Sequence, residues 1–195
     1  MKKYSFFKIF SFSNKPKVRK QKISSYDRPV KSSVDQYYSL LELIRDCQSK
    51  RLYDKMLEYC SQSLPLLETL VRDWKRQYGK FDIDSIPAIE VGCRYWAVMN
   101  DMEKLQLLSE TIQQVPELRN GWSSIVDLAY KDARLSLKIQ DYTRQNPGVL
   151  QNKMGKLLGT SGRDTGRIIR TLVNLGYIAQ IKSGTTYELK YSAHK

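Results

Sequence analysis

Histidine, cysteine and long apolar runs are scarce in this chain of 195 residues. The single His is at position 194, which argues against His-based catalysis and against Zn–His sites. Cys47, Cys60 and Cys93 are odd in number and far apart in the sequence. Such spacing is typical of reduced thiols, so we expect a cytoplasmic protein without structural disulfides.

Apolar runs long enough to enter a membrane are missing too, since no stretch approaches the ~20 uncharged apolar residues that span a bilayer. The run at residues 6–12 is short, is broken by Lys8 and has no small-residue cleavage site after it. These features argue against a secretory signal.

The sequence also lacks the usual signatures of catalysis. It has no Gly-Lys-Ser/Thr phosphate loop, and its Ser, Thr and Cys nucleophiles have no internal His to serve as a base. Asp82 and Asp84 have no third carboxylate spaced to complete a nuclease-type cluster. We therefore predict a protein that is not an enzyme, with no metal site and no cofactor.

Positive charge is what the chain has in excess, with 33 Lys and Arg against 20 Asp and Glu and a net charge of +13. Residues 1–31 hold ten basic residues and one acidic residue, and residues 141–195 hold nine and three. Residues 32–140, in contrast, hold fourteen and sixteen. A strongly basic chain makes a polyanion the expected partner, and the charge sits at the two ends.

The N-terminal segment, residues 1–31, contains little that could form a core, and we expect a disordered tail. Its first twelve residues nevertheless hold four of the five Phe of the chain, interleaved with Lys. Three interpretations stay open for this tip: an unstructured end, a peptide that docks in a partner groove, or a cationic segment resting on an anionic membrane surface.

The middle of the chain is helical by its apolar periodicity. Apolar residues at three- and four-residue steps predict helices at about 33–48, 52–60, 65–78, 85–99, 102–115 and 122–145. Pro65 fits the first turn of one helix, and Gly79 is suited to a C-cap. No strand-like alternation occurs before about residue 177.

One hairpin in this region carries a more specific pattern. Gly92 would allow close helix approach, Tyr95 would fill the groove, and Pro116 would stop the second helix. Their offsets resemble the tetratricopeptide pattern, which implies about two degenerate helical hairpins over roughly residues 33–118. An irregular helical bundle with similar hairpins accounts for the pattern equally well.

The last 50 residues have a different order of elements. They predict a short helix at 149–158, a tight turn at 160–163, a helix ending at Leu175-Gly176, a strand at 177–182, a turn at Ser183-Gly184 and a return strand at 185–190. Ser161 and Asp164 have the spacing of a capping box at the start of the second helix.

This order resembles the winged helix of bacterial transcription regulators of the multiple-antibiotic-resistance-regulator type. Their recognition helix similarly ends in Leu-x-x-x-Gly-x-Ile, as Leu172, Gly176 and Ile178 do here, and Leu158-Gly159 matches the end of the preceding helix. The resemblance covers about residues 122–192, within a predicted winged-helix domain at 122–195, and implies binding of double-stranded DNA. We therefore expect a mainly α protein, in which a helical-hairpin, tetratricopeptide-like scaffold at residues 32–121 precedes a winged helix-turn-helix with a small β-hairpin wing.

Candidate DNA contacts follow from this arrangement. A recognition helix reads base edges near its N-terminal end, where Arg163, Thr165 and Arg167 lie, and Arg170 one turn later is suited to phosphate. The helix start offers hydroxyls and N–H groups suited to phosphate. The remaining candidates are Thr160 and Ser161 at that start, Lys153 and Lys156 on the preceding helix, and Lys182, Thr185 and Thr186 on the wing.

Gly166 lies early inside the same predicted helix and admits two interpretations. A glycine there weakens the helix by ~1 kcal/mol relative to Ala. It would also let the helix approach the DNA backbone closely. Both interpretations stay open from the sequence.

The sequence thus predicts non-enzymatic binding of double-stranded DNA, in transcription regulation or in plasmid or phage replication control. The helical region would bind a protein partner or self-associate. The alternative is a scaffold or assembly protein whose winged helix binds protein, with the N-terminal Phe/Lys segment tethering it to a membrane.

Overall fold

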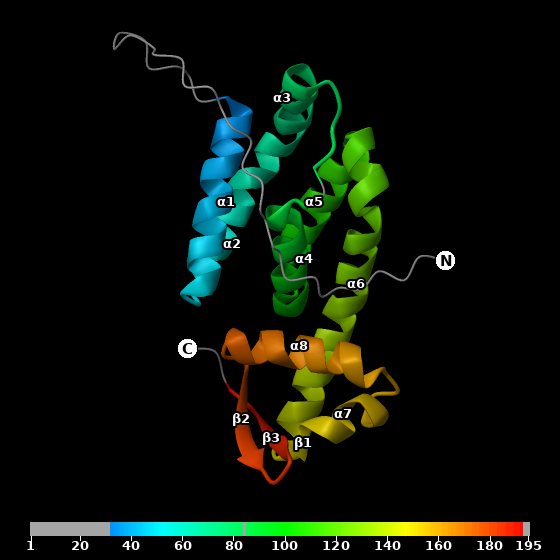
Figure 1. Ribbon diagram of the computed structural model, residues 1–195. Coiled ribbons are helices and arrows are strands. Elements are labelled where there is room, and N and C mark those ends of the chain that lie inside the picture. Colours follow the sequence, from blue (N-terminus) through cyan, green and yellow to red (C-terminus); the bar gives the residue numbers. More distant parts are fainter. Residues whose placement is uncertain (1–31, 84, 193–195) are drawn as a thin grey trace. The chain divides into compact units, whose positions relative to one another are not determined.

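The computed structural model describes residues 32–83 and 85–192, so the predictions for residues 1–31 lie outside the described part. Figure 1 shows the order of its helices and strands. They are α1 (Ser33–Ser49), α2 (Tyr53–Ser63), the 3-10 helix η1 (Leu64–Leu66), α3 (Leu67–Tyr78), α4 (Pro87–Met99), α5 (Met102–Gln114), α6 (Pro116–Gln145), β1 (Val149–Leu150), α7 (Gln151–Leu157), α8 (Gly162–Asn174), β2 (Ile178–Ser183) and β3 (Thr186–Tyr191).

Local caps mark several ends of the scaffold helices α1 to α5. At the start of α1, the Ser32 hydroxyl accepts from the Asp35 N–H at 3.1 Å, while the Asp35 carboxylate accepts from the Ser32 N–H at 3.3 Å. Helix α3 ends at Gly79, whose φ of +82° is the left-handed C-cap that the sequence predicts. Asn100, also left-handed, turns α4 into α5.

Helix α4 lies at the centre of the scaffold, in contact with α1, α2, α5, α6 and α8. Tyr95 is buried and stacks on Tyr53 of α2 with ring centroids 5.4 Å apart, so it fills the groove between two helices as predicted. Gly92 differs from the prediction. A Cβ at Gly92 would lie 2.5 Å from the ring of Trp96, so the glycine makes room for a side chain of its own helix rather than for a partner helix.

Helix α6 is longer than the sequence predicts. It begins at Pro116, where the ring is tolerated in the first turn, and not near residue 122. Helix α6 packs on α4 and α5 and also contacts α8 and β3. The boundary predicted between residues 121 and 122 therefore falls inside one continuous helix, and contacts group residues 31–195 into one compact unit.

The C-terminal sheet has three antiparallel strands in the order β1-β3-β2. The prediction that Val149 and Leu150 begin a helix is wrong: they form β1 and pair with Leu189 and Glu188 of β3. The hairpin turn is Gly184-Thr185, one residue later than predicted, because Ser183 pairs with Thr186. Gly184 has a φ of +58°, as the first central residue of a type II′ turn requires.

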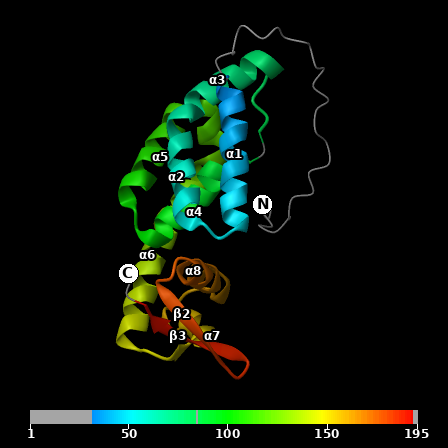
Figure 2. The same cartoon turned by 90° about the vertical axis from the view of Figure 1, so that its left-hand side faces the viewer.

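The predicted fold class is confirmed: a mainly α protein in which helices precede a helix-turn-helix and a small hairpin wing. Figure 1 shows α8 crossing α6, and in Figures 1 and 2 the scaffold helices lie above α8 and the hairpin below it. Among the described residues, no helix has the length and apolarity needed to cross a membrane. All three Cys are buried free thiols, and burial raises the pKa of Cys60 and of Cys93 to about 12.

Candidate nucleic-acid interface

Helix α8 is strongly amphipathic, and its apolar side holds it in the fold. Ile168, Ile169 and Leu172 are fully buried, and α8 packs on α6, α7 and β2. On the side that faces away from this core, Arg163 and Arg170 are exposed. Neither makes an ion pair within the described residues. Their positions, seven residues apart, place them about 10 Å from one another along the same helix face.

Gly166 lies between these two arginines on the same face. A Cβ at this position would meet no atom within 4 Å, so nothing inside the described fold requires a glycine here. The residue has no left-handed φ either, since it is absent from the glycines with positive φ among the described residues. The solvent-exposed face of α8 therefore has no side chain at Gly166, between the guanidinium groups of Arg163 and Arg170.

A tight connection between α7 and α8 sets where α8 begins. Gly155 in α7 is buried, and a Cβ there would lie 3.1 Å from the Cα of Gly162. The first turn of α8 thus packs directly on the backbone of α7, and Gly159 turns the chain between them with a φ of +64°. Gly155 is not among the residues predicted from the sequence; its signal is a glycine inside a short helix, four residues before the glycine that follows the helix end.

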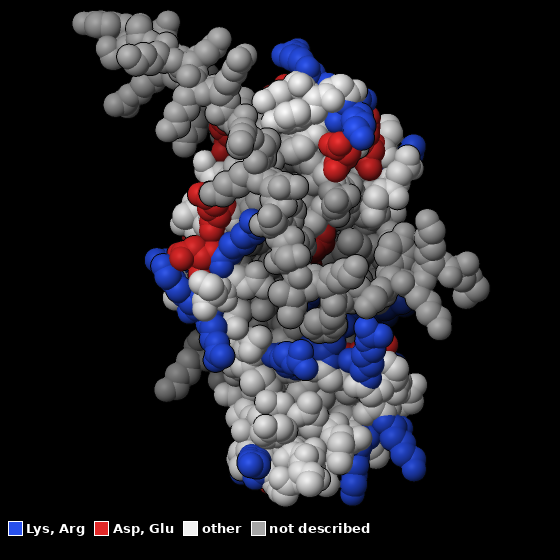
Figure 3. Space-filling view, in the orientation of Figure 1, with Lys and Arg blue, Asp and Glu red and all other residues white. Residues whose placement is uncertain are grey.

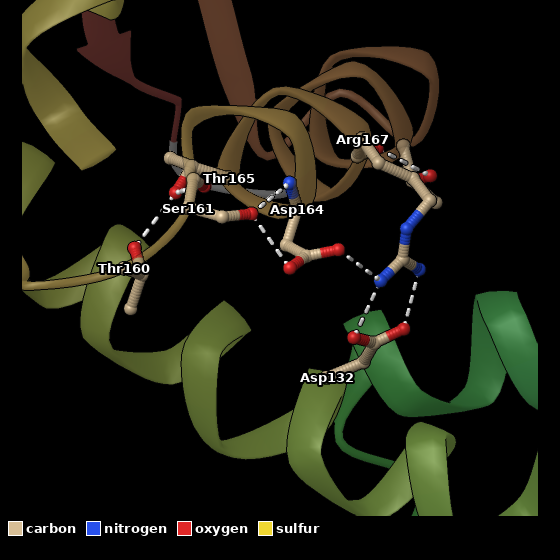
Figure 4. Close-up of polar contacts among 7 residues, drawn as sticks. Asp132, Thr160, Ser161, Asp164, Thr165 and Arg167 are labelled. Atoms are coloured by element: carbon tan, nitrogen blue, oxygen red, sulfur yellow. Dashed lines mark hydrogen bonds and ion pairs between the residues drawn. The ribbon is translucent and has the colours of Figure 1, made fainter. Parts of the chain in front are cut away.

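Arg167 does not lie free on the exposed face, contrary to the expectation of a base-edge contact. Its two terminal nitrogens donate to both carboxylate oxygens of Asp132 in α6, at 2.5 and 2.7 Å (Figure 4). The hydrogen bond that Arg167 donates to Asp132 raises the pKa of Arg167, and burial opposes this rise. The side chain of Asp132 is 7% exposed and that of Arg167 28% exposed, so this pair belongs to the packing between α6 and α8.

Thr165 is also removed from the predicted set of base contacts, because it is 1% exposed. Its hydroxyl donates to the Ser161 carbonyl at 2.9 Å and lies 2.8 Å from the Thr160 hydroxyl. Since Thr165 has one hydroxyl proton, Thr160 must be the donor in the second contact. The hydroxyl protons of Thr165 and Thr160 are therefore both used inside the protein.

Ser161 caps α8, as predicted. Its hydroxyl oxygen accepts from the Asp164 N–H at 3.0 Å and its proton is donated to the Asp164 carboxylate at 2.7 Å (Figure 4). The hydroxyls of Thr160 and Ser161 thus have no proton left for a phosphate, contrary to our expectation. The N–H groups of Gly162 and Arg163 precede the first intrahelical bond, so they are the donors that remain at this end.

The other predicted cations are exposed, on α7 and on the wing. Lys153 and Lys156 lie on α7, and Lys182 lies on β2 opposite Tyr187 of β3. Thr185 occupies the exposed turn and Thr186 is half-buried. Figure 3 shows Lys and Arg side chains over α8 and over the elements below it.

Acidic residues are rare in this part of the chain. Residues 149–192 contain seven Lys and Arg but only Asp164 and Glu188 as acids. Asp164 is partly neutralised by Arg167, whose guanidinium lies 3.7 Å away. The described surface around α7, α8 and the hairpin is therefore positively charged.

The scaffold reaches α8 at a second point that the sequence analysis missed. Helix α4 contacts α8, and Asn174 near the end of α8 interacts with Tyr95. Burial raises the pKa of the Tyr95 hydroxyl, and the interaction with Asn174 lowers it in part. Arg167 and Asn174 are seven residues apart, so one flank of α8 faces the scaffold while its neighbouring face stays open.

Compared with protein families, curated proteins and solved structures, the chain matches none of them. The case for a function therefore rests on the residues and geometry of the C-terminal region alone.

Proposed function

We propose that this chain binds double-stranded DNA, without catalysing a reaction, through the open face of α8. The observation that carries the proposal is a pair of exposed arginines on either side of Gly166, Arg163 and Arg170, which have no acidic partner in the described part of the chain. Arginine is the usual reader of guanine in the major groove, which admits an α-helix. A helix without a Cβ at its centre can come close to the floor or wall of that groove.

The two arginines would have different tasks. Arg163 lies in the first turn of α8, where recognition helices contact base edges. Arg170 lies about 10 Å further along, the length of about three base pairs, and is suited to phosphate. Phosphate contacts from other elements would fix the register of the helix. We assign these to Lys153, Lys156 and Lys182, with Thr185 and Thr186 near the wing tip.

The finer assignment is a winged helix of the multiple-antibiotic-resistance-regulator type behind a tetratricopeptide-like scaffold. The order α6, β1, α7, α8, β2, β3 and the paired helices α1–α2 and α4–α5 support it. The biological process would be transcription regulation or plasmid or phage replication control in the cytoplasm. The helical region would supply a protein-interaction or dimerisation surface.

Fluorescence anisotropy of the full chain with a labelled random-sequence duplex tests the proposal. The four cationic phosphate contacts assigned above would weaken binding by about two orders of magnitude between about 50 and 200 mM salt. Absence of binding at about 50 mM salt, where non-specific binding is strongest, would contradict it.

A second function, protein assembly through the winged helix, is favoured by exposed apolar side chains in the same region. Leu157, Ile181 and Tyr187 are 49%, 43% and 43% exposed. Under this alternative the full chain binds no duplex and instead self-associates in light scattering. Ile181→Lys would then abolish self-association.

A further inference from the structure

The ion pair between Asp132 and Arg167 joins the helix that we propose to enter DNA to the helix beneath it. Both oxygens of Asp132 accept from Arg167, at 2.5 and 2.7 Å, so the two terminal nitrogens of the guanidinium face α6. Figure 4 shows the side chain of Arg167 reaching down from α8 to Asp132. A guanidinium used in this way cannot present the same fork to a guanine or a phosphate.

DNA binding would not easily break the ion pair between Arg167 and Asp132. Asp132 is 7% exposed, and Arg167 is its only ion-pair partner within the described residues. Removing Arg167 would leave a buried carboxylate unpaired, which is strongly unfavourable. The second carboxylate nearby, Asp164, lies 3.7 Å from the guanidinium and adds to its retention.

We infer that Asp132 is a positioning residue of the DNA interface, which withdraws Arg167 and limits the contact face of α8 to Arg163 and Arg170. Arg167 stands at the edge of this face, four residues after Arg163 and three before Arg170, so its bidentate pair with Asp132, aided by Asp164, keeps it from the groove. This role of Asp132 rests on the proposed DNA binding. It explains why α8 presents two arginines to DNA and not three.

The variant that tests this is Asp132→Asn in the full chain. The amide removes the negative charge that holds Arg167, and Arg167 then becomes available for one additional phosphate contact. Each such contact steepens the dependence of log K on log salt by about 0.9, so the variant should lose about 3.5-fold more affinity than wild type between about 50 and 200 mM salt. A merely damaged fold would bind more weakly and would not gain slope.

Asp127→Asn is the matched control. Asp127 is exposed on the same helix and makes no ion pair within the described residues, so its substitution changes the net charge equally without touching Arg167. We expect Asp127→Asn to keep the wild-type slope. The double variant D132N/R167Q leaves no buried charge unpaired and should also keep the wild-type slope, because Arg167 makes no DNA contact in the wild type.

Salt titrations of anisotropy with the random duplex, after circular dichroism has verified folding, separate the outcomes. No binding by wild type at about 50 mM salt refutes the proposed function itself. If wild type binds, a slope for Asp132→Asn equal to or below that of wild type overturns the role of Asp132. Should Asp132→Asn fail to fold, the double variant decides: a slope about 0.9 shallower than wild type would show that Arg167 already contacts phosphate and would overturn the inference.

Discussion

Gly166→Ala separates stability from DNA binding more cleanly than any other substitution in this chain. Gly166 lies inside α8, and an added Cβ would meet no atom within 4 Å. Replacing glycine by alanine in a helix interior should therefore stabilise the fold by about 0.5–1 kcal/mol. For a protein of this length, 1 kcal/mol corresponds to about 2–4 °C in Tm.

The same substitution should weaken DNA binding. If α8 enters the groove between Arg163 and Arg170, the new methyl group lies where the helix comes closest to the DNA. Overpacking a tight contact by one methyl group costs about 1–3 kcal/mol, so we expect a loss of affinity of roughly fivefold or more. A stabilised protein that binds more weakly cannot be explained by unfolding.

Gly121→Ala is the matched control for this prediction. Gly121 is an exposed residue inside α6, and a Cβ there also meets nothing within 4 Å. We expect Gly121→Ala to raise the Tm by a similar amount and to leave the affinity for the duplex unchanged. Thermal melts and anisotropy titrations of both variants measure the two quantities. If Gly166→Ala binds duplex DNA as wild type does, the close approach of α8 to DNA at this residue is refuted.

Three further predictions concern the fold. Gly155→Ala should lower the free energy of unfolding, measured in urea, by about 1–3 kcal/mol, because its Cβ would lie 3.1 Å from the Cα of Gly162. Unchanged stability would contradict the tight contact between α7 and α8. Gly92→Ala should destabilise the scaffold in the same assay, since its Cβ would lie 2.5 Å from the Trp96 ring, and Trp96→Leu in the same chain should restore part of the loss. Thiols ionise near pH 9 in the unfolded chain, whereas burial raises the pKa of Cys60 and of Cys93 to about 12 in the fold. The stability that these protonated thiols contribute is therefore complete below pH 9 and is lost between pH 9 and 12. The free energy of unfolding of C60A/C93A should decline less steeply than that of wild type over this range.

Much of the fold could be predicted because periodicity and caps act locally. Six helices before residue 146 repeat apolar residues at helical spacing. Gly79 marks the end of α3 and Ser161 the start of α8, as the structure has them. Strand β1 has only two residues, too few for any period, and it is defined by pairing with β3. The first turns of α6 were missed because Arg119, Asn120 and Gly121 interrupt the apolar pattern there.

Only part of the candidate site could be predicted from the sequence. A helical wheel already places Thr165 opposite Arg163, so its burial could have been predicted from the spacing of 100° per residue. The fate of Arg167 could not, since its partner Asp132 is 35 residues away on another helix. The hydroxyls of Thr160 and Ser161 were overvalued because local hydrogen bonds consume their protons.

The most direct test of DNA binding by α8 is the salt dependence of the R163Q/R170Q double variant in the full chain. Arg76 and Arg119 are exposed scaffold arginines without ion pairs in the described part, so R76Q/R119Q removes the same charge elsewhere. Binding to a random duplex should show a slope of log K against log salt that is shallower by about 0.9 for R163Q/R170Q, because Arg170 is the phosphate contact of the pair, and unchanged for R76Q/R119Q. Equal slopes for wild type and R163Q/R170Q would contradict the account.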